Sequence, residues 1–197
     1  FAGPKYSLLR PEFSEIREAS LNRRSSSELR KILITMGGVD PLNTSGEILR
    51  ILQNCNLSSD TEITIALGSN APWISSLMEL ATQSRFSTSV KVNVSNMAKL
   101  MCDADLAIGA GGGTSWERCA VGLPTLMVAI AQNQLGSVEA LTKAGAVISL
   151  GEIGTLDQTL PASINQLNET DVLREMSFRA AQVTDGTGCE QTVQAMD

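Results

Sequence analysis

Short apolar runs alternate with amphipathic segments along most of this chain. Six runs have the length and composition of buried strands, at residues 31–36, 62–67, 90–94, 105–109, 124–128 and 146–150. Apolar residues recur at helical spacing in the segments 12–21, 41–52, 72–83, 96–102, 114–121, 134–144, 157–167, 170–182 and 188–196. Strands that alternate with helices predict an α/β fold, a doubly wound, Rossmann-like parallel sheet of six strands.

The stretch 105–128 is predicted to be the centre of this fold. Its first apolar run ends in glycines at 109 and 111–113, which let backbone approach a ligand closely. Thr114 and, three residues later, Glu117 have the spacing of a capping box at a helix start. The pattern indicates strand, glycine loop, helix and strand. The loop then lies at the carboxyl end of its strand, where ligands bind in open α/β sheets.

A phosphate is the ligand that such a helix start favours, because its first N–H groups are unpaired and the helix dipole is positive there. The sequence matches neither the Lys-bearing P-loop nor the dinucleotide GxGxxG with its later acidic residue. A tight turn with a purely structural role therefore stays open. Gly37 and Gly38 form a second junction of strand, glycine and helix.

Composition narrows the class of partner. The chain of 197 residues is 43% hydrophobic and 18% charged, as in a globular domain with a real core. A net charge of −6 and a pI near 4.8 argue against nucleic acid or an anionic membrane surface as the main partner. No apolar run approaches the ~20 residues of a membrane span. A phosphate would have to be held by backbone dipoles and one or two local cations.

The chemistry available to the chain alone is limited. Histidine is absent, so the commonest general base near neutral pH is missing, and we assign no catalytic residue. No acidic cluster has metal-ligand spacing, so no metal and no cofactor are expected. The four cysteines form no CxxC, and we interpret them as buried free thiols in a reducing cytoplasm.

Residues 1–27 are predicted to be a linker and a short helix outside the sheet, and 28–197 to be one α/β domain. Four arginines in this first segment either face another domain or are simply solvated: Arg10, Arg17, Arg23 and Arg24. The chain begins at Phe1 rather than Met, which we interpret as a sign that it is a piece of a longer protein.

Two motifs carry a family resemblance. TMGGVDP at 35–41 and GAGGGTSWERCAVGLP at 109–124 resemble the carboxyl-terminal domain of nucleotide-sugar enzymes of the GT-B superfamily. The chain looks most like the UDP-sugar hydrolases of pseudaminic acid biosynthesis and their spore-coat polysaccharide relatives. GPKYSLLRPEF at 3–13 and DGTGCEQTV at 185–193 extend this likeness. The lipid-linked N-acetylglucosaminyltransferases of peptidoglycan synthesis are similar at the glycine-rich block.

The resemblance implies one half of a two-domain architecture. This half would bind UDP or a UDP-sugar, and the partner would be an amino-terminal domain that supplies a catalytic histidine. Gly112, Gly113, Thr114 and Ser115 would bind the diphosphate; the alternative is an ordinary N-cap turn. The Glu117 carboxylate would accept hydrogen bonds from both ribose hydroxyls; the alternative is that it closes the capping box.

The same resemblance assigns the neighbouring loops. Gly37 and Gly38 would let a second loop approach the phosphates or the donor sugar. We expect Asp40 to cap the following helix, because its charge repels phosphate. Asn43 and Thr44 are either polar contacts to the ligand or plain capping residues.

Two further loops complete the predicted site. Val94 and Met97 follow the third strand, where relatives of this kind bind uracil through backbone groups; Met97 packs either on the base or in the core. Asn133 and Gln134, after Gln132, resemble a segment that faces the donor sugar, since amides suit hydroxyl and acetamido groups. The alternative is a polar loop with an N-cap.

We therefore interpret the chain as the UDP-binding domain of a UDP-sugar hydrolase acting on a deoxy, N-acetylated sugar nucleotide in surface polysaccharide or pseudaminic-type acid biosynthesis. The domain alone is expected to be inactive. A glycosyltransferase with the same UDP-leaving step is the alternative enzyme, and a non-catalytic nucleotide-sugar-binding module is the alternative outside catalysis.

Overall fold

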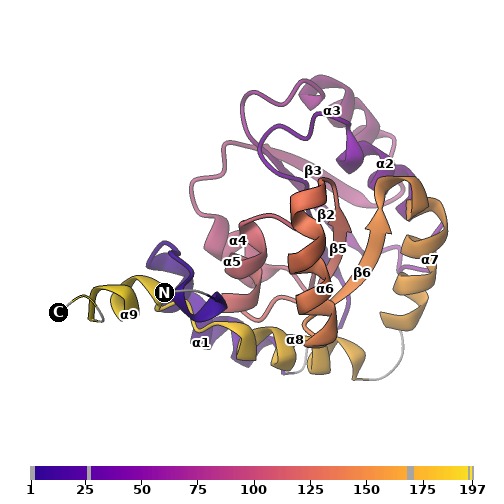
Figure 1. Ribbon diagram of the computed structural model, residues 1–197. Helices are drawn as coiled ribbons and strands as arrows, with labels where there is room; N and C mark the ends of the chain where they lie inside the picture. The colour runs from indigo at the N-terminus through magenta and orange to yellow at the C-terminus, as the bar shows by residue number, and fades with distance from the viewer. Residues whose placement is uncertain (1–2, 26–27, 168–170, 195, 197) are drawn as a thin grey trace.

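Six parallel strands form one sheet at the centre of the molecule (Figure 1). The structure, a computed structural model, describes residues 3–25, 28–167, 171–194 and 196. The strands are β1 (Lys31–Thr35), β2 (Glu62–Leu67), β3 (Ser87–Val92), β4 (Leu106–Ala110), β5 (Thr125–Ala129) and β6 (Val147–Glu152). Their order is β3-β2-β1-β4-β5-β6. The chain thus builds from β1 toward one edge and from β4 toward the other, which confirms the predicted doubly wound fold.

Helices cover both faces of this sheet. They are α1 (Glu12–Arg24), α2 (Thr44–Leu52), α3 (Ile74–Thr82), α4 (Met97–Asp103), α5 (Thr114–Ala120), α6 (Leu135–Lys143), α7 (Leu156–Leu167), α8 (Val172–Val183) and α9 (Gly188–Gln194). Ile32 and Ile34 pack with α2, α3 and α7, whereas Leu33 between them packs with α1, α4 and α5. Successive strand residues point to opposite faces, so two covered faces require the continuous apolar runs seen in the sequence.

Strand boundaries follow the sequence closely, with one exception. Five of the strands begin and end within two residues of the prediction, but β3 begins at Ser87, three residues before the predicted 90–94, and ends at Val92. β3 is an edge strand whose residues alternate between exposed and half-buried. Its serines and threonines are therefore compatible with a strand although they interrupt the apolar run. Val94 consequently lies in the loop after β3.

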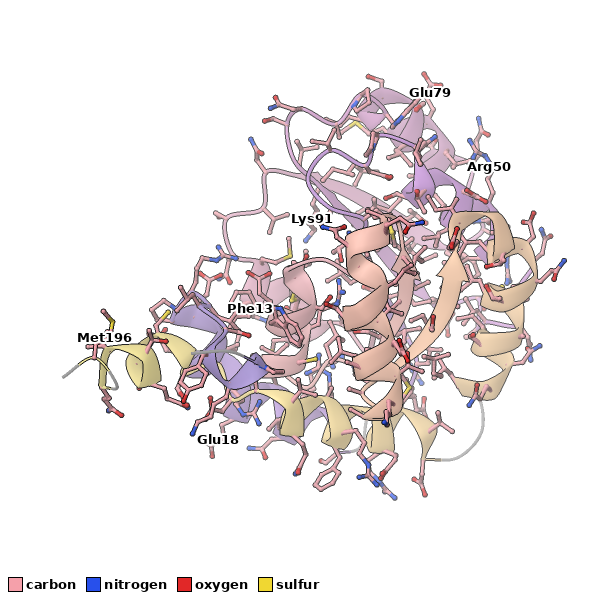
Figure 2. All side chains as sticks on the ribbon, viewed as in Figure 1. Phe13, Glu18, Arg50, Glu79, Lys91 and Met196 are labelled. Atoms are coloured by element: carbon pink, nitrogen blue, oxygen red, sulfur yellow. The ribbon has the colours of Figure 1, made fainter. Side chains whose placement is uncertain are left out.

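Helix α1 packs on α4, α5 and α8. Phe13 is fully buried and points from α1 toward the body of the domain (Figure 2). Arg17 donates to the carbonyl oxygens of Ala120, Ala181 and Thr184, and Arg23 pairs with Asp105. Arg24 is buried.

Both interpretations offered for these arginines are thus wrong for Arg17, Arg23 and Arg24. Arg17 and Arg24 bind backbone carbonyl groups of the helices packed on α1. Arg23 pairs with Asp105, which directly precedes β4. The separation of 1–27 from 28–197 as two units stays a prediction.

The two ends of the chain lie together at one side of the molecule (Figure 1). Helix α9 contacts the 3₁₀ turn Pro4–Tyr6, and a Cβ on Gly188 would stand only 2.7 Å from the Ser7 nitrogen. Glycine is therefore needed at this crossing. Three cysteines are buried free thiols as predicted, whereas Cys189 is exposed. Among the described residues, no helix has the length and apolar character needed to cross a membrane.

Candidate functional site

The predicted site lies where β1 and β4 run side by side. Thr35 and Gly109 are partners in the register, and each stands at or next to the carboxyl end of its strand. After β1 the chain turns toward β2, and after β4 it turns toward β5. The loops that follow these strands therefore diverge. The region between them at the carboxyl ends of β1 and β4, called the crevice below, is the place where doubly wound sheets bind ligands.

The loop after β4 offers backbone donors. The N–H groups of Gly112, Gly113 and Thr114 meet no acceptor among the described residues. Gly113 is exposed, and a Cβ added there would meet nothing within 4 Å. Unpaired N–H groups in an open loop are suited to bind an anion. The structure thus supports the prediction that this loop has ligand-binding geometry, while the ligand stays a prediction.

The predicted capping box is wrong. Gly113 already has helical angles (φ −56°, ψ −32°), α5 begins at Thr114, and no side chain caps it. Thr114 is therefore the first helical residue instead of the N-cap. Ser115 is buried, and its N–H donates to the Gly112 oxygen at 3.0 Å. Its hydroxyl lies inside the domain, so Ser115 as a phosphate ligand is less accessible than Thr114.

Glu117 pairs with an arginine instead of capping the helix. Its Oε1 lies 3.6 Å from the Nη2 of Arg10, and its side chain is 18% exposed. Burial raises the pKa of the Glu117 carboxyl, and the Arg10 guanidinium partly opposes this shift. Of the two interpretations of Glu117, the capping role is excluded, and the ribose role stays a prediction.

Arg118, which the sequence analysis did not single out, lies beside the glycine loop. Its guanidinium is 1% exposed and donates to the carbonyl of Ala110 at 2.7 Å, to Ser115 Oγ at 3.2 Å and to Thr35 Oγ1 at 3.2 Å. Burial lowers its pKa to about 10, so it remains charged at neutral pH. The only sequence signal was its i,i+3 spacing from Ser115, which places both on the inner face of α5.

Gly109 makes room for this guanidinium. A Cβ at this position would overlap Nη1 of Arg118 and stand 2.8 Å from its Cζ and 3.1 Å from Thr35 Oγ1. The guanidinium cannot move aside freely, because it is buried and hydrogen-bonded. Gly109→Ala should therefore lower the free energy of unfolding by about 1–3 kcal/mol, as overpacking does. Urea unfolding measures this change.

Gly136 provides the matched control. It is an exposed glycine in α6, and a Cβ there would meet nothing within 4 Å. Gly136→Ala should raise the free energy of unfolding by about 0.5–1 kcal/mol, the difference in helix propensity. If both variants unfolded at the same urea concentration, the role given to the space beside Arg118 would be wrong.

The loop after β1 is closed to anions at its helix start. Asp40 accepts from the N–H groups of Thr44 and Ser45 at 2.9 Å each, so the prediction that Asp40 caps this helix is confirmed. Gly37 has φ 91° and is exposed with Gly38, whose oxygen accepts from Gly68 N at 2.8 Å. The two glycines, together with Val39, Pro41 and Leu42, stay exposed in this loop.

The side chain of Asn43 does not cap α2, and contact of Asn43 or Thr44 with a ligand stays a prediction. Asn43 has a left-handed backbone (φ 55°) and makes no side-chain cap. Its amide packs over Gly46, where a Cβ would stand 2.6 Å from Asn43 Oδ1. Thr44 is buried, and its N–H binds Asp40. Both side chains therefore take part in the packing at the start of α2.

Gln134 approaches the glycine loop, and its neighbour does not. Gln134 Oε1 accepts from the N–H of Ile130 at 3.1 Å, and its Nε2 lies 3.7 Å from where a Cβ on Gly112 would stand. Asn133 is exposed in the 3₁₀ turn Gln132–Gln134. A cavity of about 260 Å³ opens beside this turn, lined by residues from the ends of β5 and β6, among them Gln132 and Glu152.

Val94 lies in the loop after β3, and Met97 is the first residue of α4. Both are half-buried and pack against the apolar cluster that contains Phe13. Trp116, next to Glu117 in the sequence, packs against the same cluster. The packing alternative for Met97 is therefore present in the structure, and contact with a base stays a prediction.

Within the part of the chain that the structure describes, no group of three or more histidine, cysteine, aspartate or glutamate residues is placed to hold a metal ion.

Two curated relatives and one solved structure place this chain among known proteins. It is 36% identical over 137 residues to the uncharacterized protein MJ1062 of Methanocaldococcus jannaschii, which covers 68% of this chain and 28% of that protein. It is 27% identical over 192 residues to the spore coat polysaccharide biosynthesis protein SpsG of Bacillus subtilis, covering 95% of this chain and 55% of SpsG. The chain therefore spans about half or less of these relatives.

The fold is that of MurG from Acinetobacter baumannii, with a TM-score of 0.74 and 20% identity over 89% of this chain and 52% of MurG. The family described as Glycosyltransferase family 28 C-terminal domain matches residues 32–187, from the first strand to the start of the last helix. This match includes both glycine loops, Glu117, Arg118 and Gln134. The chain therefore belongs to the family of glycosyltransferase family 28 C-terminal domains.

Proposed function

We propose that this domain binds the nucleotide part of a UDP-sugar in the crevice between the loops that follow β1 and β4. One observation carries the proposal: the loop after β4 is open and has unpaired N–H groups at Gly112, Gly113 and Thr114, in a domain of this family. A diphosphate is the part of a nucleotide sugar that such donors recognise. The net charge of −6 leaves this work to local groups instead of a basic surface.

The remaining contacts follow from the positions of the loops. The Glu117 carboxylate would accept from the two ribose hydroxyls, and backbone groups near Val94 and Met97 would bind uracil. Gln134, whose Nε2 faces the glycine loop, and Asn133 would face the donor sugar beside the cavity lined by Gln132. Ser115 supports this arrangement from inside the domain.

The reaction of the longer protein is a UDP-leaving step. In the hydrolase that we propose, water attacks the anomeric carbon, the bond from that carbon to the phosphate oxygen breaks, and UDP leaves with its negative charge. The N–H groups of the glycine loop would stabilise that charge. The base is expected to be a histidine of an amino-terminal domain, and this chain has none.

A glycosyltransferase is the second candidate, and the family match favours it specifically. The same UDP-leaving step then transfers the sugar to an acceptor that the other domain selects. The similarity to SpsG supports a role in surface polysaccharide biosynthesis in either case. We place the protein in the cytoplasm, in line with its free thiols.

Calorimetry with four nucleotides tests the proposal on the 197-residue chain. We expect UDP to bind more tightly than UMP and ADP, and 2′-deoxy-UDP to bind more weakly than UDP. No sugar nucleotide should be hydrolysed by this chain alone. A titration in which UDP produced no heat and no thermal stabilisation would refute the nucleotide site, and equal affinity for UDP and ADP would refute the uracil assignment.

A further inference from the structure

The guanidinium of Arg118 lies beneath the glycine loop, on the side away from solvent. It is 1% exposed, and Nη2 donates to the Ala110 carbonyl at 2.7 Å and to Ser115 Oγ at 3.2 Å. Ala110 precedes the loop and Ser115 follows its last free N–H group. One planar cation thus bridges the residues at the two ends of the loop.

This buried cation has no carboxylate partner. Among the described residues, no carboxylate oxygen lies within 4 Å of Arg118, and its Nε has no hydrogen-bond partner. Glu117 is adjacent in the sequence, but it pairs with Arg10. Burying an unpaired charge is costly. The guanidinium is held by neutral carbonyl and hydroxyl oxygens alone, so its positive charge is left to act on an anion bound at the glycine loop above it.

The strand ends are shaped to hold this cation. Gly109 leaves the space that Nη1 fills, and Thr35 Oγ1 accepts from the same nitrogen at 3.2 Å. Both residues lie at or next to the carboxyl ends of the two central strands, where the chain connections diverge toward opposite edges of the sheet. The position of the charge is therefore fixed by the scaffold on two sides.

We propose that Arg118 is a positioning residue that supplies a fixed positive charge behind the glycine loop and so compensates the diphosphate of the bound nucleotide without touching it. The inference rests on the nucleotide site proposed above. A charge inside the protein acts through an effective dielectric constant of about 20 instead of 80, so it is felt across the thin loop. The loop N–H groups contact the phosphates, and Arg118 strengthens their field and holds them in place.

Three ligands of decreasing negative charge, UDP, UMP and uridine, test this role on the 197-residue chain. Arg118→Met and Arg118→Gln remove the charge, and Arg118→Lys retains it without the planar fork. Calorimetry follows UDP and UMP, and NMR shift titration follows uridine. We expect both neutral variants to weaken UDP by about tenfold, UMP by less and uridine not at all, since the loss scales with ligand charge. Arg118→Lys should bind UDP within about threefold of the unaltered chain.

Thr35→Val is the matched control, because it removes one acceptor of the guanidinium and leaves the charge in place. It should retain the tighter binding of UDP relative to uridine. The role of Arg118 is overturned if the neutral variants bind UDP as the unaltered chain does. It is equally overturned if all three ligands weaken by one factor, since that reports a distorted loop. Absence of UDP binding by the unaltered chain would instead remove the proposed nucleotide site itself. Circular dichroism shows that each variant is folded, and the two neutral substitutions provide independent chances of that.

Discussion

Arg24→Met should lower the free energy of unfolding by about 3 kcal/mol, the largest stability effect that we expect from a single polar side chain here. Arg24 is 3% exposed and donates to the carbonyl groups of Met101 and Ala104 at 2.6 and 2.8 Å and of Val121 at 3.1 Å. Its removal leaves these oxygens with fewer donors in a buried place. The cost of unpaired buried carbonyls is what makes the loss large.

The measurement is thermal and urea unfolding of the purified variant. A loss of this size corresponds to a fall in Tm of about 6–12 °C for a domain of this length. Arg50→Met is the control, since Arg50 is exposed on α2 and its side chain points into solvent (Figure 2). It should change stability by less than about 0.5 kcal/mol. If Arg24→Met unfolded with the control, α1 would not be fixed to the sheet domain in the way described.

The same helix shows what the sequence could not provide. Four arginines within 10–24 suggested a surface or a partner, because charge alone predicts exposure. The structure gives Arg17 and Arg24 backbone carbonyl acceptors from α4, α5 and α8. Carbonyl groups belong to every residue, so nothing in the sequence marks those that a distant arginine will meet. The helix itself was predictable from its spacing, and its partners were not.

The strands were predictable because burial on both faces leaves its mark on composition. Residues 32–34 and 106–108 are continuous apolar runs, and the structure places them side by side in β1 and β4. β3 lacked that mark because an edge strand is half-exposed.

The capping box shows how a local motif loses to a distant residue. Thr114 and Glu117 had the right spacing, but Gly113 adopted helical angles and moved the helix start by one residue. Arg10, more than a hundred residues earlier, then paired with the Glu117 carboxylate. A motif that depends on one carboxylate is predicted only as well as the competitors for that carboxylate are known.

Glu117→Gln should weaken UDP binding by about 10- to 100-fold while the domain stays folded. The reason is geometric: a carboxylate accepts from both ribose hydroxyls, whereas an amide presents one oxygen and two donors. Hydrogen bonds to a charged acceptor contribute about 1.5–3 kcal/mol, which is this range of affinity. Calorimetry with UDP measures the change, and circular dichroism confirms the fold.

Two controls separate the ribose contact from its surroundings. 2′-Deoxy-UDP already lacks one hydroxyl, so Glu117→Gln should reduce its affinity by much less than it reduces that of UDP. Arg10→Gln removes the 3.6 Å ion pair and leaves the carboxylate in place, so UDP should still bind more tightly than its deoxy analogue. Loss of that preference in Arg10→Gln would transfer the role from Glu117 to Arg10.

The pH dependence gives an independent test of the same carboxylate. Burial raises the pKa of Glu117 above that of an exposed glutamate. The Glu117 carboxyl must lose its proton before it can accept hydrogen bonds from both ribose hydroxyls. UDP affinity should therefore be highest above this raised pKa and should fall as the pH drops through it. UDP itself gains protons at low pH, which also changes its affinity. The Glu117→Gln variant measures this effect of ligand protonation alone, because its amide does not titrate. The ratio of the UDP affinity of the unaltered chain to that of the Glu117→Gln variant should therefore fall toward one in acid. A ratio that stayed constant from neutral pH to the acid limit of folding would mean that the ionised carboxylate does not bind the ribose.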